Sequence, residues 1–331
     1  MARVFLSKHV RSLLLACAAV AALPAAQAQT PWPSARPITL IVPFTAGGGT
    51  DAIARMVGQK LGARLGQAVV IENVGGGGGT IGTAKAVAAA SDGYTILLGV
   101  DSPLLIAKLL NPRAVRYDAF RDLTPIGLVS TSPMVLMARP GLAANTLPEV
   151  IALAKAKPGK LTYATSGIGT ILHLGMERLK QQSGIDVTHV PYRGGAQALT
   201  DLMGDQVDLA LLTTGSALAP VTGRKVKGVV LTDDKRLSTL PDVPALSEFK
   251  EFKGMKLLTW IGLYAPERTP GEIVSRLNKE LDAVLQAPDV RSRLSEQGAL
   301  PGGGTPEEFG AFVRSEQPRY EDIVKSADIH E

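Results

Sequence analysis

Three glycine-rich segments each lead into a stretch with the pattern of a helix. The first, Gly47-Gly48-Gly49, precedes Thr50-Asp51; the second, Gly75 to Gly79, precedes Thr80; the third spans Thr165 to Thr170. A helix N-terminus exposes backbone N–H groups and about half a positive charge, and glycine lets a ligand approach them closely. These segments therefore indicate a site that donates hydrogen bonds to a carboxylate or a similar anion.

Other interpretations of these loops stay open. Glycine also permits a tight turn between a strand and a helix without any ligand, although three loops of one design favour anion binding. The segment Gly77 to Gly82 fits the GxGxxG pattern of dinucleotide-binding loops, and Asp101 follows the next predicted strand, where a ribose-binding acid would lie. An oxidoreductase that uses this loop is the alternative function, weakened because five consecutive glycines make an accidental match easy.

Residue types needed for other chemistry are scarce. The histidines after residue 28 are His173, His189 and His330, and no two are spaced as helical metal ligands. Cys17 is the only cysteine, no GxSxG nucleophile motif occurs, and no P-loop lysine follows a glycine cluster. We therefore expect no catalytic residue, no metal site and no cofactor, and hence a protein that is not an enzyme.

The first 28 residues have the pattern of a secretory signal peptide. Basic residues precede an apolar run from Leu13 to Leu23, and the segment ends in Ala26-Gln27-Ala28; the basic residues are Arg3, Lys8 and Arg11. The apolar run is well short of the roughly 20 residues that a membrane-spanning helix needs. We expect cleavage after Ala28 and a mature protein outside the cytoplasm, so the alternative oxidoreductase would be a secreted one.

Size and charge narrow the class of protein further. Three of the 35 basic residues lie in the signal peptide, which leaves 32 basic against 30 acidic side chains after residue 28. This near-balance, with 5% aromatic residues, gives no basis for nucleic-acid binding or membrane attraction. The remaining 303 residues exceed what one core usually organises, which predicts two domains.

Apolar periodicity predicts alternating strands and helices after residue 37. The expected strands are 38–42, 68–71, 94–100, 161–164, 187–190, 207–212, 227–231 and 256–264, and the expected helices are 50–65, 80–90, 150–156, 170–182 and 196–203. This alternation is typical of a largely parallel sheet. The C-terminal tail is predicted to be helical, with a capping box at Thr305 and Glu308 and a kink or break at Pro318.

Two segments have the character of crossings between domains. They are residues 126–138 and the stretch 242–256, which is rich in proline and glycine. Two crossings mean that the middle of the chain is inserted into the first domain. We expect residues 29–131 and 252–331 to form lobe 1, and residues 132–251 to form lobe 2.

Several motifs together resemble one known family. They are Pro37 to Phe44, Gly47 to Asp51 with Arg55, Val70-Ile71-Glu72-Asn73, Gly78 to Gly82, Asp92-Gly93-Tyr94-Thr95, His189 to Gly194, and Leu237 to Pro244. In this combination the chain resembles the substrate-binding receptors of tripartite tricarboxylate transporters, the Bug family. The resemblance covers essentially the whole mature chain.

The resemblance implies an α/β fold of the type II periplasmic-binding-protein class, with two lobes of mainly parallel sheet joined by two crossings. Such a receptor closes around a small carboxylate-containing metabolite and delivers it, unaltered, to the membrane permease subunits of the transporter. A ligand sensor for a signalling partner has the same sequence features and is a further alternative. We expect a monomer that binds no nucleic acid.

The resemblance also implies the ligand-binding residues. Two loops are expected to hold one carboxylate, partly through ordered waters, while two further segments line the opposite wall. The residues are Phe44, Thr45, Gly48, Gly49, Thr50, Asp51, Asp101, Ser166, Gly167, Gly169, Thr170, Tyr192, Arg193, Gly194, Thr213 and Thr214.

Two positions depart from the family pattern. Val74-Gly75-Gly76-Gly77 stands where relatives tend to have Arg-Pro-Gly-Ala, which loosens the loop and removes a charge. Asp101 is a carboxylate near a site for carboxylates, and like charges at close range repel. We expect Asp101 to point away from the ligand; the alternative is that it selects a ligand that also carries an amine or another donor.

Overall fold

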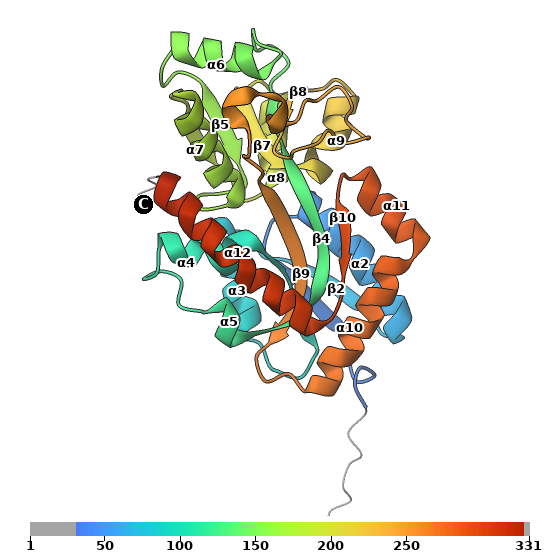
Figure 1. Cartoon of the computed structure of the whole chain (residues 1–331). Coiled ribbons are helices and arrows are strands. Elements are labelled where there is room, and N and C mark those ends of the chain that lie inside the picture. The colour runs from blue at the N-terminus through green and yellow to red at the C-terminus, as the bar shows by residue number, and fades with distance from the viewer. Residues whose placement is uncertain (1–30, 328–331) are drawn as a thin grey trace, which may run out of the picture. The chain divides into compact units, whose positions relative to one another are not determined.

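The computed structural model describes residues 31–327 (Figure 1). The chain divides into two units, Met1–Pro31 and Trp32–Glu331, and the description below concerns the second. The predicted signal peptide, residues 1–28, and His330 lie outside the described residues. None of the helices between residues 31 and 327 combines the length and the apolar character that crossing a membrane requires.

Ten strands within residues 31–327 form one sheet, in the order β2-β1-β3-β9-β4-β7-β5-β6, with β8 and β10 also paired to β4. The two sides of the sheet consist of parallel strands: β1 pairs with β2 and with β3 on one side, and β5 pairs with β6 and with β7 on the other. Between them, β9 is antiparallel to β3 and to β4, and β4 is antiparallel to β7. The strands are β1 (Ile38–Val42), β2 (Val69–Asn73), β3 (Thr95–Val100), β4 (Leu123–Ala138), β5 (Thr162–Thr165), β6 (Thr188–Pro191), β7 (Leu209–Thr213), β8 (Lys227–Leu231), β9 (Leu258–Pro266) and β10 (Leu300–Gly303).

Helices join successive strands and cover the sheet (Figure 1). The α-helices are α2 (Gly49–Leu65), α3 (Thr80–Val87), α4 (Ala107–Leu110), α5 (Ala119–Asp122), α6 (Leu147–Ala156), α7 (Ile171–Ser183), α8 (Gly195–Met203), α9 (Thr214–Thr222), α10 (Gly271–Gln286), α11 (Pro288–Glu296) and α12 (Pro306–Ala327). Short turns of tighter or wider helix are η1 (Gly77–Gly79), η2 (Ser102–Ile106), η3 (Leu246–Glu248) and η4 (Lys250–Phe252). The alternation of strands and helices predicted from periodicity is therefore present, with most ends shifted by one to three residues.

Side chains on both faces of the inner strands are buried. Leu40 and Leu98 belong to the apolar cluster that includes α2 and α10, whereas Ile41 and Leu97 belong to the cluster on the other face. Burial on both faces is the rule for parallel strands covered by helices, and it explains why these strands are continuous apolar runs in the sequence.

Strand β4 carries the first predicted crossing. Its residues up to Pro133 pair with β9, and from Met134 onward it pairs with β7. The partner therefore changes between Pro133 and Met134, within one unbroken strand that runs between the lower and upper groups of elements in Figure 1. Thr232 fastens this point, because its Oγ1 accepts a hydrogen bond from Met134 N at 2.9 Å and donates one to Leu257 O at 2.6 Å.

The C-terminal helix α12 begins with the predicted capping box. Thr305 Oγ1 accepts from Glu308 N at 3.1 Å, and Glu308 Oε2 accepts from Thr305 N at 2.8 Å. Of the kink or break predicted at Pro318, the break is absent, since the helix continues through the proline to Ala327. Buried Phe309 and Tyr320, one on each side of the proline, hold both halves against the molecule and offset the one hydrogen bond that proline cannot donate.

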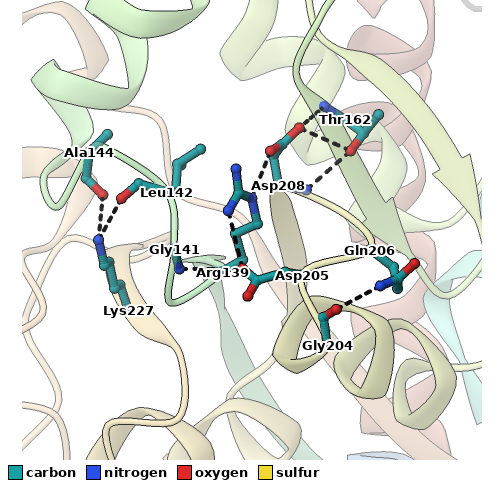
Figure 2. A network of polar contacts seen from close by, with 10 residues as sticks. All are labelled: Arg139, Gly141, Leu142, Ala144, Thr162, Gly204, Asp205, Gln206, Asp208 and Lys227. Atoms are coloured by element: carbon teal, nitrogen blue, oxygen red, sulfur yellow. Dashed lines mark hydrogen bonds and ion pairs between the residues drawn. The ribbon is translucent and has the colours of Figure 1, made fainter.

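A polar network fastens the ends of three strands (Figure 2). Arg139 Nε donates to Asp208 Oδ1 at 2.9 Å, and Asp208 Oδ2 accepts from Thr162 N at 2.9 Å. Arg139 Nη1 also pairs with Asp205 at 3.2 Å. Asp208 is thus occupied in joining β4, β5 and β7, which gives this acid a structural role.

Candidate functional site

One cavity lies between the N-termini of α2 and α7, and we refer to it as the α2–α7 cavity. Its volume is about 40 Å³, room for roughly three water molecules. It is lined by Phe44, Thr45, Gly48, Gly49, Thr50, Asp51, Val100, Asp101, Ser102, Ser166, Ile171, Leu172, Gly195, Leu212, Thr213, Ser216 and Thr259. The first and third glycine-rich loops therefore meet at one place.

The N-terminus of α2 presents backbone donors to this cavity. The amide of Gly49 donates to Ser216 Oγ at 2.9 Å, and Ser216 comes from α9. Among the described residues, no hydrogen bond is made by the amides of Thr50 and Asp51, which belong to the first turn, where N–H groups have no partner within the helix. Two N–H groups thus remain to bind an acceptor in the cavity.

The N-terminus of α7 is arranged in the same way. Ile171 N donates to Ser102 Oγ at 3.0 Å, and His173 N donates to Thr170 Oγ1 at 3.3 Å. Between them, the amide of Leu172 makes no hydrogen bond to another described residue. Thr170 is the N-cap of α7, so this predicted site residue shapes the helix end and does not itself line the cavity.

Asp51 holds the first glycine-rich loop in shape. Its Oδ2 accepts from Gly47 N and from Arg55 Nε, each at 2.9 Å, and its Oδ1 accepts from Asn73 Nδ2 at 2.9 Å. Burial by itself raises the pKa of Asp51, but these hydrogen bonds and the nearby guanidinium outweigh it and lower the pKa. The carboxylate therefore stays ionised and engaged, and it positions the α2 N-terminus.

Asp101 follows β3 and is 1% exposed. Its Oδ1 accepts from Ser102 N at 2.6 Å and from Ser102 Oγ at 2.8 Å, and its Oδ2 accepts from Trp260 N at 3.2 Å. Burial raises the pKa of Asp101 to about 6, although these hydrogen bonds and one with Thr259 act in the opposite direction. Asp101 therefore lines the cavity while its oxygens are directed at neighbouring protein groups.

Other predicted residues lie around a second, outer hollow of about 360 Å³. Gly167, Gly169, Tyr192 and Arg193 line it together with Gly77 and Gly78 of the second glycine-rich loop. The Tyr192 hydroxyl donates a hydrogen bond to Asp201 at 2.6 Å. This bond holds the Tyr192 side chain against α8, the helix that contains Asp201.

Two further predicted residues, Gly194 and Thr214, line neither space. A Cβ on Gly194 would lie 2.1 Å from Thr45 Oγ1, so the loop after β6 packs directly against the loop after β1. Thr214 is buried and donates to Pro133 O at 2.7 Å. Both therefore lie behind the cavity wall and support it.

The cavity also contains residues that the sequence patterns did not single out. They are Val100, Ser102, Ile171, Leu172, Gly195, Leu212, Ser216 and Thr259. Ser102 directly follows Asp101 and Ser216 lies three residues after Thr213, so each adjoined a predicted residue. Ser102 accepts a hydrogen bond from the amide of Ile171, and Ser216 accepts one from the amide of Gly49. These partners lie far along the chain, so no local sequence pattern reveals that the two serines belong to the cavity.

The second glycine-rich loop packs against the third. Gly78 has φ +61°, and a Cβ there would lie 2.6 Å from Ile168 O. Asp101, the acid that the dinucleotide interpretation needs on a ribose, is buried among Ser102 and Trp260. Within residues 31–327, no cluster of three or more His, Cys, Asp or Glu side chains could hold a metal ion.

Comparison with known proteins identifies relatives over most of the chain. The family model "Tripartite tricarboxylate transporter family receptor" matches residues 53–329. Protein BugT of Bordetella pertussis is 33% identical over 294 residues, covering 88% of this chain and 89% of BugT.

Two solved structures from Rhodopseudomonas palustris are similar along nearly their whole length. The structure of Rpa4515 with adipate has a TM-score of 0.87 and is 32% identical in sequence; the match covers 91% of this chain and 99% of Rpa4515. The structure of MatC with bound malate has a TM-score of 0.83 and is 33% identical in sequence; the match covers 88% of this chain and 99% of MatC. The fold is that of periplasmic binding proteins, and such relatives are solute receptors and not enzymes, which removes the oxidoreductase alternative. The chain belongs to the family of tripartite tricarboxylate transporter receptors.

Proposed function

We propose that this protein is an exported periplasmic receptor that captures a small carboxylate in the α2–α7 cavity and delivers it to the permease subunits of a tripartite tricarboxylate transporter. Membership of the receptor family supports the transport role, and the signal-peptide pattern of residues 1–28 supports export. The ligands named for two similar structures, adipate and malate, support a carboxylate as the solute.

The observation that carries the proposal is the convergence of free amides on one cavity. Thr50, Asp51 and Leu172 each bring a backbone N–H that no other described residue occupies, at the N-termini of two helices. Aligned peptide dipoles make such ends favourable for anions. The described lining contains no lysine or arginine, so a carboxylate there would be held by neutral donors, namely these N–H groups and the hydroxyls of the lining.

We further propose that residues 29–131 with 252–331 and residues 132–251 act as two lobes that close on the ligand as a monomer. Support comes from the hydrogen bonds that cross this division next to the cavity, Gly49 N to Ser216 Oγ and Ile171 N to Ser102 Oγ. A cavity of about 40 Å³ is small for a dicarboxylate, so entry requires the walls to part.

The proposal is tested by removing one N–H without removing the helix. Proline is tolerated in the first turn, and Pro148 already occupies that turn of α6 in this chain. Thr50→Pro deletes the amide donor, whereas the matched control Thr50→Ala removes the side-chain hydroxyl and methyl group but keeps the amide. Titration calorimetry with adipate, malate and other small mono- and dicarboxylates is expected to show binding about tenfold weaker for Thr50→Pro and nearly unchanged for Thr50→Ala.

Equal affinity of both variants for the best acid of the panel would show that these amides do not hold the ligand. Circular dichroism of Thr50→Pro establishes that α2 is intact, so that weaker binding is not a sign of misfolding.

A further inference from the structure

Asp101 is an acid buried in the wall of a cavity for anions. No basic side chain of the described residues lies within ion-pair distance of it, and its partners are the neutral groups of Ser102, Thr259 and Trp260. A second negative charge in the same cavity raises the free energy of the ionised form, because like charges at short range repel strongly where water is excluded.

The charged groups around Asp101 do not offset the repulsion between its carboxylate and a bound carboxylate. Across the cavity, Asp51 is ionised and paired with Arg55. On α12, the buried phenol of Tyr320 faces Asp101 and stays protonated, because burial raises its pKa well above the ordinary value. Arg319 of the same helix is paired with Glu316 at 2.9 Å.

A proton on Asp101 would also change what Ser102 can do. In the structure the Ser102 hydroxyl donates to Asp101 Oδ1 and accepts from Ile171 N. A protonated Asp101 instead donates its own O–H to Ser102 Oγ, which has a second lone pair and still accepts from Ile171. The Ser102 O–H is then free to donate to an acceptor in the cavity that it lines.

We propose that each carboxylate captured in the α2–α7 cavity is accompanied by one proton from solvent, held on Asp101, and that this proton turns Ser102 into a donor to the ligand. This inference rests on the proposed function and adds its specificity rule. The rule concerns ligands without an amine, because an ammonium group beside Asp101 would favour the ionised acid and leave the Ser102 hydroxyl bonded to it. The raised pKa of Asp101, about 6 before a ligand enters, is in keeping with it.

The test is calorimetric titration of the protein with adipate between pH 6 and pH 8.5, where adipate itself stays ionised. The expected dissociation constant rises with pH by up to about tenfold per unit, the limit for one linked proton. Titrations at pH 7 in two buffers of different ionisation enthalpy are expected to show uptake that approaches one proton per ligand. A dissociation constant that does not change with pH, with no proton uptake, would overturn the inference.

Variants locate the proton. Asp101→Asn is expected to bind adipate at pH 8 more tightly than the natural protein does and to lose the pH dependence, while the exposed control Asp242→Asn keeps it. If Asp101→Asn does not fold, the buffer experiment on the natural protein still decides whether a proton is taken up with the ligand. Wild-type pH dependence in a folded Asp101→Asn would place the proton elsewhere and refute the assignment.

A matched pair of ligands separates the remaining outcomes. Glutarate and glutamate differ by one ammonium group, and the inference expects glutarate to take up one proton on binding and to bind more weakly as pH rises. Tighter binding of glutamate that strengthens as pH rises would mean that Asp101 recognises an amine, which contradicts it. If adipate, malate, glutarate and the other acids all fail to bind at pH 6, the proposed function itself is wrong.

Discussion

Two serine hydroxyls carry the contacts between the helix ends at the cavity and residues far along the chain. Ser216 accepts from the amide of Gly49, and Ser102 accepts from the amide of Ile171. Each hydroxyl accepts the hydrogen bond of an N–H group that a ligand oxygen would otherwise accept. At each helix end, one backbone N–H is therefore bonded to a serine, and the N–H of the following residue, Thr50 or Leu172, has no partner among the described residues. The fixed N–H positions the free one.

Replacing Ser216 by alanine leaves the buried Gly49 amide without its acceptor. An unsatisfied buried donor costs about 1–3 kcal/mol, so Ser216→Ala is expected to lower the free energy of unfolding by that amount, measured by urea denaturation. The control is Thr222→Ala on the same helix, whose exposed hydroxyl bonds only to carbonyls of its own helix. Equal stability of the two variants would show that the Gly49–Ser216 hydrogen bond contributes nothing in solution.

At the scale of elements, the second glycine-rich loop makes a close contact with the third. Gly78 lies against the backbone of Ile168, and Gly167 in turn lies against Gly78, since a Cβ on Gly167 would be 3.2 Å from Gly78 Cα. A side chain at position 78 would push the two loops apart. The glycines at this point therefore allow the predicted lobes to meet backbone to backbone.

Gly78→Ala tests this contact. The variant must strain a left-handed residue and displace Ile168 O, so carboxylate affinity is expected to fall about tenfold or more, measured by calorimetry. Gly66→Ala is the matched control, because Gly66 has φ +66° and a Cβ there would meet no other atom within 4 Å. It should lose about 1 kcal/mol of stability but keep its affinity; an equal loss of affinity in both variants would argue against a closing contact.

Most elements could be predicted because their local signals agree. The buried parallel strands are apolar runs, and helices such as α2 end at a glycine, Gly66, in the left-handed conformation. Strand β4 was not recognised as a strand, because Pro125, Pro133 and the polar residues Ser130 to Ser132 interrupt its apolar pattern. Its neighbours β9, β7 and β8 supply the pairing that the local sequence does not indicate.

The candidate site divides in the same way. Phe44 to Asp51 lie together because a strand, a glycine turn and a helix are consecutive in the chain, and the motif locates them. The partners of Asp101 could not be predicted, since Trp260 reaches it only through the pairing of β3 with β9. The contact of Ser216 with Gly49 likewise joins residues 167 positions apart.

At the scale of the whole molecule, the two predicted lobes share a fixed point near Pro133 and Met134. Thr232 is bonded there to both segments that pass between the lobes, at Met134 N and at Leu257 O. Any closing motion has to bend the chain beside this tie, because the ladder of β4 changes partner at the same position.

Thr232→Val removes the two side-chain hydrogen bonds of this tie while keeping the side-chain shape, and the backbone hydrogen bonds of Thr232 with Met134 O and Leu257 N stay. It leaves one buried N–H and one buried C=O unsatisfied, so we expect a loss of about 2–5 kcal/mol in urea unfolding and a larger radius of gyration by X-ray scattering without ligand. Thr188→Val, which removes an exposed hydroxyl bonded to a single carbonyl, is the control. If Thr232→Val has the same free energy of unfolding and the same radius of gyration as that control, the side-chain hydrogen bonds of Thr232 do not hold the two segments together.

The described lining of the α2–α7 cavity contains neither lysine nor arginine. In the proposed function, an anion there would be attracted by peptide dipoles that act over a few ångströms inside the protein, where dissolved ions do not enter. Screening by electrolyte weakens fields that pass through water, with a range near 8 Å at physiological ionic strength. Such a receptor would therefore retain its solute across large changes in external salinity.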